Sequence, residues 1–266
     1  MSEPKPTILK IGGSVITDKN GELAAKTHEI DRLSQEIQEA RVTNLIVVHG
    51  GGSFGHPAAE RYALKYGYKE ESQKIGFSET HHYMTVLNGL FMDSLIWHNV
   101  PSVSITPSSC IITENGRIKD FEDTPLRNLL KMNFIPVLYG DTVFDTKLGF
   151  TILSGDQLVS ALALRFNARR IVIGVDEDGV YDADPKVEKN ARLFEHLTLE
   201  ELKKLQSKLG KTIARDVTGG MGGKMAELVS AVEMRISVTV INALEPRYVY
   251  KALRGESVKG TNIEKE

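Results

Sequence analysis

The chain has 266 residues, and 33 lysines and arginines stand against 35 aspartates and glutamates, which gives a formal net charge of −2. This length suits one large α/β domain or two lobes, and the balanced charge excludes the broad basic surface typical of nucleic-acid-binding proteins. A single cysteine, Cys110, excludes an internal disulfide framework and a cysteine-rich zinc site. The N-terminal residues show no signal-peptide pattern and no apolar run is long enough for a membrane span, so we expect a cytoplasmic protein without membrane or nucleic-acid partners.

The first half of the chain alternates short apolar runs with segments of helical spacing. The runs that predict buried strands are residues 8–11, 45–48, 100–105 and 134–138. Thr27 is the expected cap of a first helix, in which Ile30, Leu33 and Ile37 follow helical spacing. Residues 78–97 predict a longer helix, whose broad apolar side contains Met84, Leu87, Leu90, Phe91 and Leu95.

The second half repeats this alternation. A helix is expected after Ser154, a strand over 171–175, a helix over 220–234 and a strand over 238–241. Thr198 and Glu201 have the spacing of a capping box at the start of another helix. Strands that are apolar on both faces and alternate with helices indicate a mainly parallel sheet covered by helices on both sides. In such a sheet the ligand site lies at the carboxyl ends of the strands, which is where the glycine clusters fall.

Two of these clusters follow the first two strands. Lys10 precedes Gly12 and Gly13, so backbone N–H groups and a cationic side chain can meet an anion there, although a tight turn with an exposed lysine is an equally good interpretation. His49 opens the stretch HGGGSFGH and His56 closes it. Three successive glycines let a phosphate approach the main chain, and His56 can donate to it, whereas we expect His49 only to orient the end of the strand.

Two further clusters bring carboxylates and a lysine. Asp141 and Asp156 each follow a strand, and each is either a simple cap or a group that orients lysines in a polar cleft. Lys224 follows a run of glycines, in the stretch that begins at Thr218 and Gly219, near a predicted helix start. The stretch is not a Walker A loop, because Met225 replaces the required serine or threonine, and the chain has no dinucleotide-binding fingerprint after residue 49.

The motifs KIGGS, HGGG, SGDQL, DGVYDADP and GGMGGKM, in this order across nearly the whole chain, resemble the amino acid kinase superfamily. Within it, Lys19 and the loop that ends at His56 resemble the isopentenyl phosphate kinases, with the fosfomycin kinases next. The resemblance implies an open αβα sandwich around a mainly parallel sheet, in a single domain over 1–266. It also implies an acceptor-binding lobe over about 1–167, an ATP-binding lobe over about 168–266, and a homodimer.

The resemblance further implies a reaction in which isopentenyl phosphate and Mg-ATP give isopentenyl diphosphate and ADP. The predicted catalytic residues are Lys10, Lys19, His56 and Asp156. The predicted acceptor-binding residues are Gly51, Gly52, Gly55, His56, Gly89 and Gly155. The predicted ATP-binding residues are Lys10, Gly12, Gly13, Ser14, Gly52, Asp176, Gly179, Tyr181, Asp182, Asp184, Pro185, Gly220 and Lys224. We expect Mg²⁺ to be carried by the nucleotide phosphates and its hydration shell, with no dedicated protein ligands.

The apolar tail of the acceptor requires a pocket, for which we select the helix over 78–97, with Met84, Leu87, Gly89 and Phe91 near the substrate. An ordinary core or dimer face is the competing interpretation of that apolar stripe. Gly89 is notable, because glycine inside a helix costs about 1 kcal/mol relative to alanine, so it could make room for a ligand. Two other functions stay open: a kinase for fosfomycin or another small phosphonate or phosphate, and a non-catalytic nucleotide sensor of the same fold.

Overall fold

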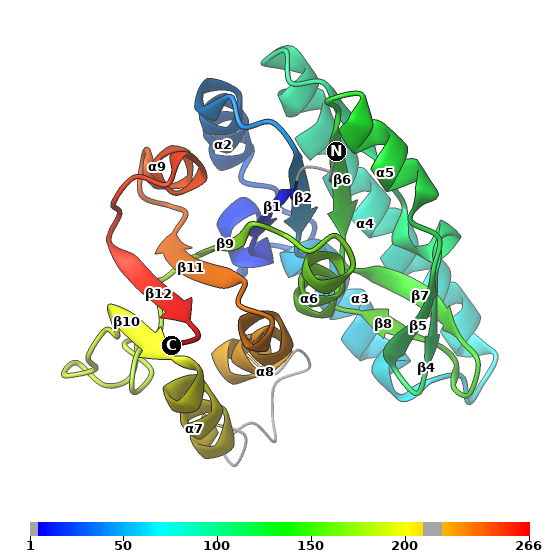
Figure 1. The fold of residues 1–266 in the computed structure, drawn as a ribbon. Coiled ribbons are helices and arrows are strands. Elements are labelled where there is room, and N and C mark those ends of the chain that lie inside the picture. Colours follow the sequence, from blue (N-terminus) through cyan, green and yellow to red (C-terminus); the bar gives the residue numbers. More distant parts are fainter. Residues whose placement is uncertain (1–4, 210–219) are drawn as a thin grey trace.

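The computed structural model describes residues 5–209 and 220–266, in which an eight-stranded sheet lies between two helical layers (Figure 1). Its strands, in spatial order, are β10 (His196–Thr198), β12 (Gly260–Glu264), β11 (Ser237–Asn242), β9 (Arg170–Val175), β1 (Thr7–Ile11), β2 (Leu45–His49), β6 (Ile135–Tyr139) and β3 (Ser102–Ser104). The pair β11–β12 is antiparallel, and the other neighbouring pairs of this sheet are parallel. The predicted three-layer, mainly parallel architecture is confirmed.

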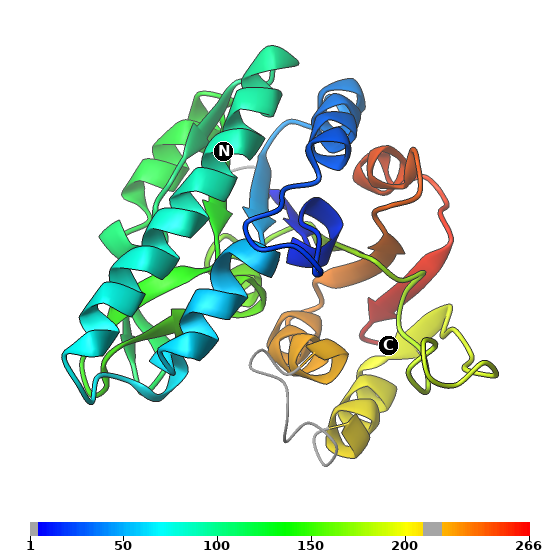
Figure 2. The same ribbon diagram turned by 180° about the vertical axis from the view of Figure 1, so that it is seen from behind.

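Successive residues of the central strands face two separate apolar cores, because side chains alternate across a sheet. Ile8 of β1 lies in a core with α5 (Thr124–Lys131), α6 (Gly155–Arg165), α7 (Leu199–Leu209) and α8 (Gly220–Glu233). Leu9 lies in the opposite core with α1 (Gly13–Ile16), α2 (Thr27–Ala40), α3 (Gly52–Arg61), α4 (Ser72–Trp97) and α9 (Tyr248–Arg254) (Figure 2). Both faces of the sheet are covered, which explains why its central strands are mostly apolar on both faces.

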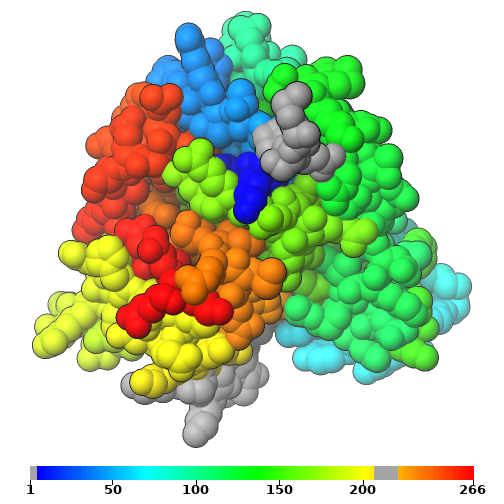
Figure 3. Space-filling model, in the orientation of Figure 1, coloured from blue at the N-terminus to red at the C-terminus, as the bar shows by residue number. Residues whose placement is uncertain are grey.

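The space-filling view shows the middle and the C-terminal part of the chain on opposite sides of the molecule (Figure 3). Green atoms form one side, and yellow-to-red atoms form the other. β1 joins the two, since it pairs with β2 on one edge and with β9 on the other. None of the helices in the two described ranges combines the length and apolarity needed to cross a bilayer.

A second sheet of four strands was not predicted. It contains, in spatial order, β5 (Arg117–Phe121), β4 (Ile111–Glu114), β7 (Asp141–Asp145) and β8 (Gly149–Leu153). Polar residues interrupt these strands, so no continuous apolar run marks them in the sequence. One signal in the local sequence does exist, the pair Asn115–Gly116, because Asn-Gly is typical of a two-residue hairpin turn. In the structure these residues have the positive φ angles that such a turn requires, 49° and 75°. Two short 3₁₀ helices, η1 (Leu64–Tyr66) and η2 (Pro107–Ser109), complete the described elements.

The buried carboxylate of Asp145 ties the turn between β4 and β5 to the turn between β7 and β8. It accepts hydrogen bonds of 2.7–3.1 Å from the Thr113 hydroxyl group and from the backbone N–H groups of Asn115, Gly116, Lys147 and Leu148. Burial by itself would raise the pKa of Asp145, but the N–H donors hold that pKa well below its usual range. The ionised carboxylate is therefore part of the folded structure.

Replacing Asp145 by asparagine should lower the free energy of unfolding by about 2 kcal/mol at pH 7, because charge-assisted hydrogen bonds to two turns are lost. The lowered pKa stabilises the fold above the unfolded-state value of about 3.9, and this stabilisation is lost as the pH falls below it. Urea unfolding of wild type and Asp145→Asn at pH 7 and pH 3 should show a smaller difference at pH 3. The exposed Asp120, replaced in the same way, provides the control. An equal difference at both pH values would contradict the role of the charge.

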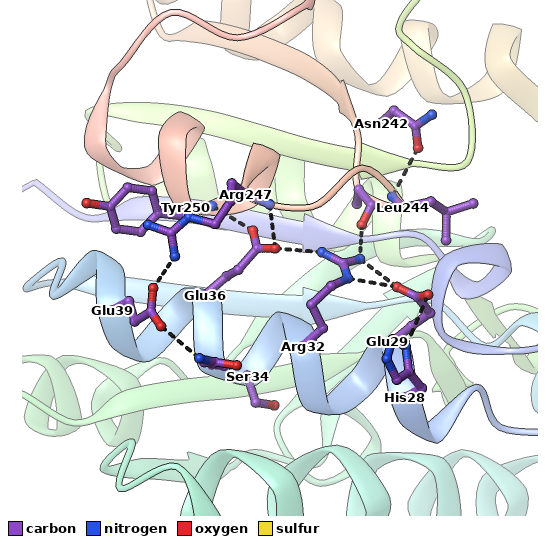
Figure 4. A network of polar contacts seen from close by, with 12 residues as sticks. His28, Glu29, Arg32, Ser34, Glu36, Glu39, Asn242, Leu244, Arg247 and Tyr250 are labelled. Atoms are coloured by element: carbon purple, nitrogen blue, oxygen red, sulfur yellow. Dashed lines mark hydrogen bonds and ion pairs between the residues drawn. The ribbon is translucent and has the colours of Figure 1, made fainter.

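A second buried carboxylate holds α9 against α2 (Figure 4). Glu36 of α2 accepts hydrogen bonds from the N–H groups of Arg247, at 2.8 Å, and Tyr250, at 3.0 Å, where α9 begins. Arg32 donates to Glu36, at 2.6 Å, and to the carbonyl of Ala243, at 2.5 Å. The N–H groups of a helix's first turn have no acceptors within the helix. Glu36, which is 211 positions before Arg247 in the sequence, provides the missing acceptor.

Several helix details differ from the prediction. Helix α2 begins at Thr27 itself, and Lys26 occupies the cap position without a side-chain hydrogen bond, so Thr27 is not the cap. Helix α4 begins at Ser72 rather than at 78, and Gln73 secures this start by accepting from the N–H groups of two preceding residues. Leu90 is 37% exposed, whereas the other four predicted apolar positions of this helix are buried. At 100° per residue Leu90 falls on the outer edge of that apolar side.

Other local predictions are confirmed. The Thr198 N–H donates to the Glu201 carboxylate at 2.9 Å, and the Glu201 N–H donates back to the Thr198 hydroxyl group at 3.2 Å, which is a capping box. Ser154 caps α6 by accepting from the Gln157 N–H at 3.1 Å. Each predicted strand is present with small shifts at its ends. Thr218 and Gly219, which open the last glycine cluster, lie outside the described residues.

Candidate active site

The loops that follow β1 and β2 are in direct contact. A Cβ atom on Gly13 would lie 2.2 Å from the backbone nitrogen of Gly52, and one on Gly50 would lie 2.7 Å from the nitrogen of Gly13. Gly52 also has a φ of 49°, in the left-handed region. Thr17 supports the contact, since its hydroxyl group donates to the Gly13 carbonyl, at 2.8 Å, and accepts from the Ser53 N–H, at 3.0 Å. The first two glycine clusters therefore form one backbone surface.

Next to this surface, Asp156 bridges two lysines from distant parts of the chain. Lys10, near the end of β1, donates to one carboxylate oxygen, and Lys224 of α8 donates to the other at 3.0 Å. Burial lowers the pKa of Lys10 to about 8 although Asp156 opposes this effect. Burial would raise the pKa of Asp156, but the two lysines lower it to about 2. At neutral pH the arrangement is thus a carboxylate between two ammonium groups.

These groups line a cavity of about 440 Å³. This volume is in the range of small-molecule sites. The wall combines cationic side chains and glycine backbone with apolar side chains from α3, α4 and the second sheet. The apolar wall residues are Ala59, Met84, Leu148, Ile152 and Leu153. An anion with a short apolar tail matches this division.

The structure brings one group of predicted site residues to the cavity wall. They are Lys10, Gly13, Gly51, Gly55, His56, Gly155, Asp156 and Lys224. Met84 is the only one of the four pocket residues selected on α4 that lies on this wall. Leu87 and Phe91 are buried in the core between α4 and the large sheet. Gly89 is not on the wall and faces open space, so its predicted contact with the acceptor is not supported by its position.

A second group forms a separate cluster beside β9. Asp176 accepts from the Ser14 hydroxyl group at 2.7 Å and from Lys19 at 3.0 Å. Lys186 adds a weaker contact to the same carboxylate at 3.4 Å. Burial would raise the pKa of Asp176, and the hydrogen bonds from Ser14 and Lys19 hold it well below its usual range. The Lys19 side chain is 61% exposed, so it can reorient.

The remaining predicted ATP residues lie in the loop after β9 and at nearby backbone positions. A Cβ atom on Gly179 would lie 2.5 Å from the Thr261 hydroxyl oxygen, so this glycine is explained by close packing on β12. Asp182 and Asp184 accept hydrogen bonds from backbone N–H groups of the same loop. Within the described residues, none of these contacts identifies a ligand. The positions concerned, which are absent from the cavity wall, are Gly12, Ser14, Gly52, Asp176, Gly179, Tyr181, Asp182, Asp184, Pro185 and Gly220.

His49 and Asp141, two further candidates from the sequence, both contact aromatic or histidine side chains. His49 is buried, stacks on Tyr139 and meets the edge of Phe91, and its burial lowers its pKa to about 4. Asp141 lies on the cavity wall, and one of its carboxylate oxygens is 3.0 Å from His81 Nδ1. Its predicted alternative as a lysine-orienting group stays a prediction, whereas Asp156 has the bonds to two lysines.

Cavity residues from the second sheet were missed by the sequence-based prediction. They include Asn115, Gly116, Leu148, Thr151 and Ile152. The Asn115–Gly116 pair between partly apolar segments is the one signal that points to a hairpin there. Nothing in the local sequence indicates that this hairpin packs over the ends of the central strands, because that depends on tertiary contacts such as those of Asp145.

Replacing Gly89 by alanine tests its predicted acceptor contact directly. A Cβ atom there meets nothing within 4 Å, so we expect stability to rise by about 1 kcal/mol from better helix propensity, with unchanged substrate KM values. The matched variant is Gly51→Ala, whose Cβ atom would lie 2.8 Å from Met84 Sδ on the cavity wall. It should raise the acceptor KM severalfold. A raised acceptor KM in Gly89→Ala would restore Gly89 to the site.

Comparison with known proteins shows the family to which this fold and cavity belong. The model of the amino acid kinase family matches residues 5–242. Isopentenyl phosphate kinase of Methanothermobacter thermautotrophicus is 39% identical over 96% of this chain and 98% of its own length. The enzyme of the same name from Methanocaldococcus jannaschii is 36% identical over 97% and 98%. A solved structure of an isopentenyl phosphate kinase superposes with a TM-score of 0.86 at 36% identity, over 97% of this chain and 99% of the other.

Proposed function

The chain belongs to the amino acid kinase family, and we propose that it transfers the γ-phosphate of ATP to isopentenyl phosphate, giving isopentenyl diphosphate and ADP. One observation carries the proposal: a single cavity joins the Lys10–Asp156–Lys224 cluster and two glycine loops to an apolar wall. The lysines and glycine backbone of the wall suit phosphates, and its apolar side chains suit a five-carbon tail.

The acceptor is itself a nucleophile, since a phosphate monoester has a second pKa near 6 and is a dianion over most of the neutral range. No side chain has to remove a proton. The barrier is the repulsion between two anionic phosphates, and phosphoryl transfer is catalysed mainly by positioning and by charge neutralisation.

Each residue then has a distinct proposed role. Lys10 and Lys224 face the phosphates of ATP, and Asp156 keeps both ammonium groups charged and oriented. His56 and the backbone N–H groups of Gly51 and Gly55 hold the acceptor phosphate. Lys19 leaves Asp176 and approaches the transferred group, for which its exposure gives it freedom. The other predicted ATP contacts, including Gly12, Ser14 and Tyr181, stay predictions.

Magnesium fits this site only as a companion of the nucleotide. Within residues 5–209 and 220–266, no group of three or more histidine, cysteine, aspartate or glutamate side chains could hold a metal ion. Of the two carboxylates on the cavity wall, Asp156 is bonded to lysines and Asp141 to His81. When bound, Mg²⁺ supplies neutralisation of phosphate charge. A homodimer, a division into lobes at about residue 167 and a cytoplasmic location stay predictions as well.

An ADP-release assay over a panel of acceptors tests the function. The panel contains isopentenyl phosphate, dimethylallyl phosphate, fosfomycin, uridylate and acetylglutamate. We expect the highest kcat/KM with isopentenyl phosphate, because the apolar wall matches its tail. Turnover of isopentenyl phosphate no faster than that of acetylglutamate would overturn the proposal. Tight ATP binding with no turnover of any acceptor would instead identify a nucleotide sensor.

A further inference from the structure

The turn between β4 and β5 is fixed to the helix end that carries Asp156. Asn115 and Gly116 of this turn line the cavity. The side chain of Gln157, the residue after Asp156, donates to the Gly116 carbonyl at 2.9 Å and accepts from the Ile118 N–H at 3.1 Å. Gln157 is buried, so both bonds are shielded from water. The turn and the start of α6 therefore move as one unit.

The same turn is also bonded to α8. Arg117 forms a two-pronged pair with Glu227, with Nη1–Oε1 and Nη2–Oε2 distances of 2.5 and 2.9 Å. Lys224 precedes Glu227 by one helical turn on the same side of α8, because residues three apart are neighbours on a helix. Lys224 in turn reaches Asp156 at 3.0 Å. Elements β4, β5, α6 and α8 can be followed in Figure 1.

These contacts close a ring. It runs from the cavity wall at Gly116 through Gln157 and α6 to Asp156, on to Lys224 and α8, and back through Glu227 and Arg117. We propose that the Arg117–Glu227 pair is a positioning contact, which sets the place of Lys224 by holding α8 to the turn that lines the cavity at Asn115 and Gly116. That Lys224 takes part in catalysis rests on the proposed function, whereas the placement of Lys224 by this pair does not.

The strength of the pair comes from its geometry. The Arg117 side chain is 64% exposed and that of Glu227 is 20% exposed, so water reaches the pair from the arginine side. A bidentate guanidinium–carboxylate pair is directional and holds two elements in a fixed relation. An exposed pair of this kind changes an equilibrium by up to about fivefold, and replacement of one partner by a like charge adds repulsion.

Charge exchange separates positioning from other effects. Arg117→Glu and Glu227→Arg should each weaken binding of a non-hydrolysable ATP analogue, and lower kcat/KM for ATP, by about fivefold to tenfold. The double variant Arg117→Glu/Glu227→Arg should return both quantities to within about twofold of wild type. Lys203→Glu is the matched control, because Lys203 pairs with Glu233 at the other end of α8 at 2.7 Å. This control should leave ATP binding unchanged.

Two results would overturn the proposal: a double variant no better than the weaker single variant, or a control that weakens ATP binding as much as Arg117→Glu. Binding of the ATP analogue is measured in the absence of acceptor. The thermal unfolding of each variant is measured separately, to show that the variant is folded. If wild type failed to phosphorylate isopentenyl phosphate but the exchange pattern in analogue binding held, the proposed function would fail and the positioning contact would stand.

Discussion

Asp156→Asn should lower kcat/KM for ATP by about 10²–10³-fold, since it removes the carboxylate that bridges the buried Lys10 and the part-buried Lys224. Without Asp156, burial and repulsion from Lys224 push the pKa of Lys10 below its wild-type value of about 8. The ammonium form of Lys10 is the active one, so activity is lost as the pH rises through this pKa. The alkaline limb of the pH profile of kcat/KM, which reports the free enzyme, should therefore move to lower pH in the variant.

The control for this variant is Asp123→Asn. Asp123 also accepts from two cationic side chains, Arg127 and Arg165, but it is not on the cavity wall. Its replacement should leave the pH profile in place. Unfolding must be measured in parallel, because loss of one partner from a buried ion pair costs about 3–5 kcal/mol. A pH profile identical to that of wild type in Asp156→Asn would contradict the role assigned to Asp156.

His56→Ala should lower kcat by about 10²–10³-fold while ATP-analogue affinity changes less than about twofold. His56 lies on the cavity wall and belongs to α3, next to Gly55 in the sequence. Lys10, Asp156 and Lys224 come from other elements. A charge-assisted hydrogen bond from its ring to the acceptor phosphate holds the nucleophile in line for transfer, so its loss affects the acceptor and not ATP.

Substitution of the exposed His82 by alanine provides the matched control, with activity expected to stay unchanged. His56→Gln offers a second comparison, since its amide can donate to phosphate and should recover part of the lost kcat. Equal loss of acceptor turnover and ATP-analogue affinity in His56→Ala would assign His56 to folding rather than to the acceptor.

The sequence predicts the large sheet and the nearness of its glycine loops well, for one physical reason. Strands buried on both faces leave uninterrupted apolar runs, such as residues 45–48, and parallel strands place their carboxyl ends at one edge. Glycines at those ends then predict an anion-binding surface. Gly13 and Gly52 confirm the spatial part of this inference, because their backbones touch.

The part of the cavity wall that the second sheet forms is not predicted, since it is built by tertiary contacts that leave little trace in local sequence. The second sheet alternates polar and apolar residues, and its position over the cavity depends on Asp145 and Gln157 reaching across to other segments. Gly89 is a different case. An unfavourable residue inside a helix predicts a ligand there, but the position is not on the cavity wall and a Cβ atom would meet nothing within 4 Å, so the Gly89→Ala variant has to decide.

The place of β1 in the large sheet bears on how the chain can be made. Thr7 at the start of β1 pairs with Leu45 on one edge and with Arg170 on the other. During synthesis, β1 leaves the ribosome well before β9, so its second edge stays uncovered until residue 170 and beyond have been made. Until then this largely apolar strand has an unpaired edge, the kind of segment that pairs with other chains. Production as two separate halves would therefore expose this strand, and chain completion protects it.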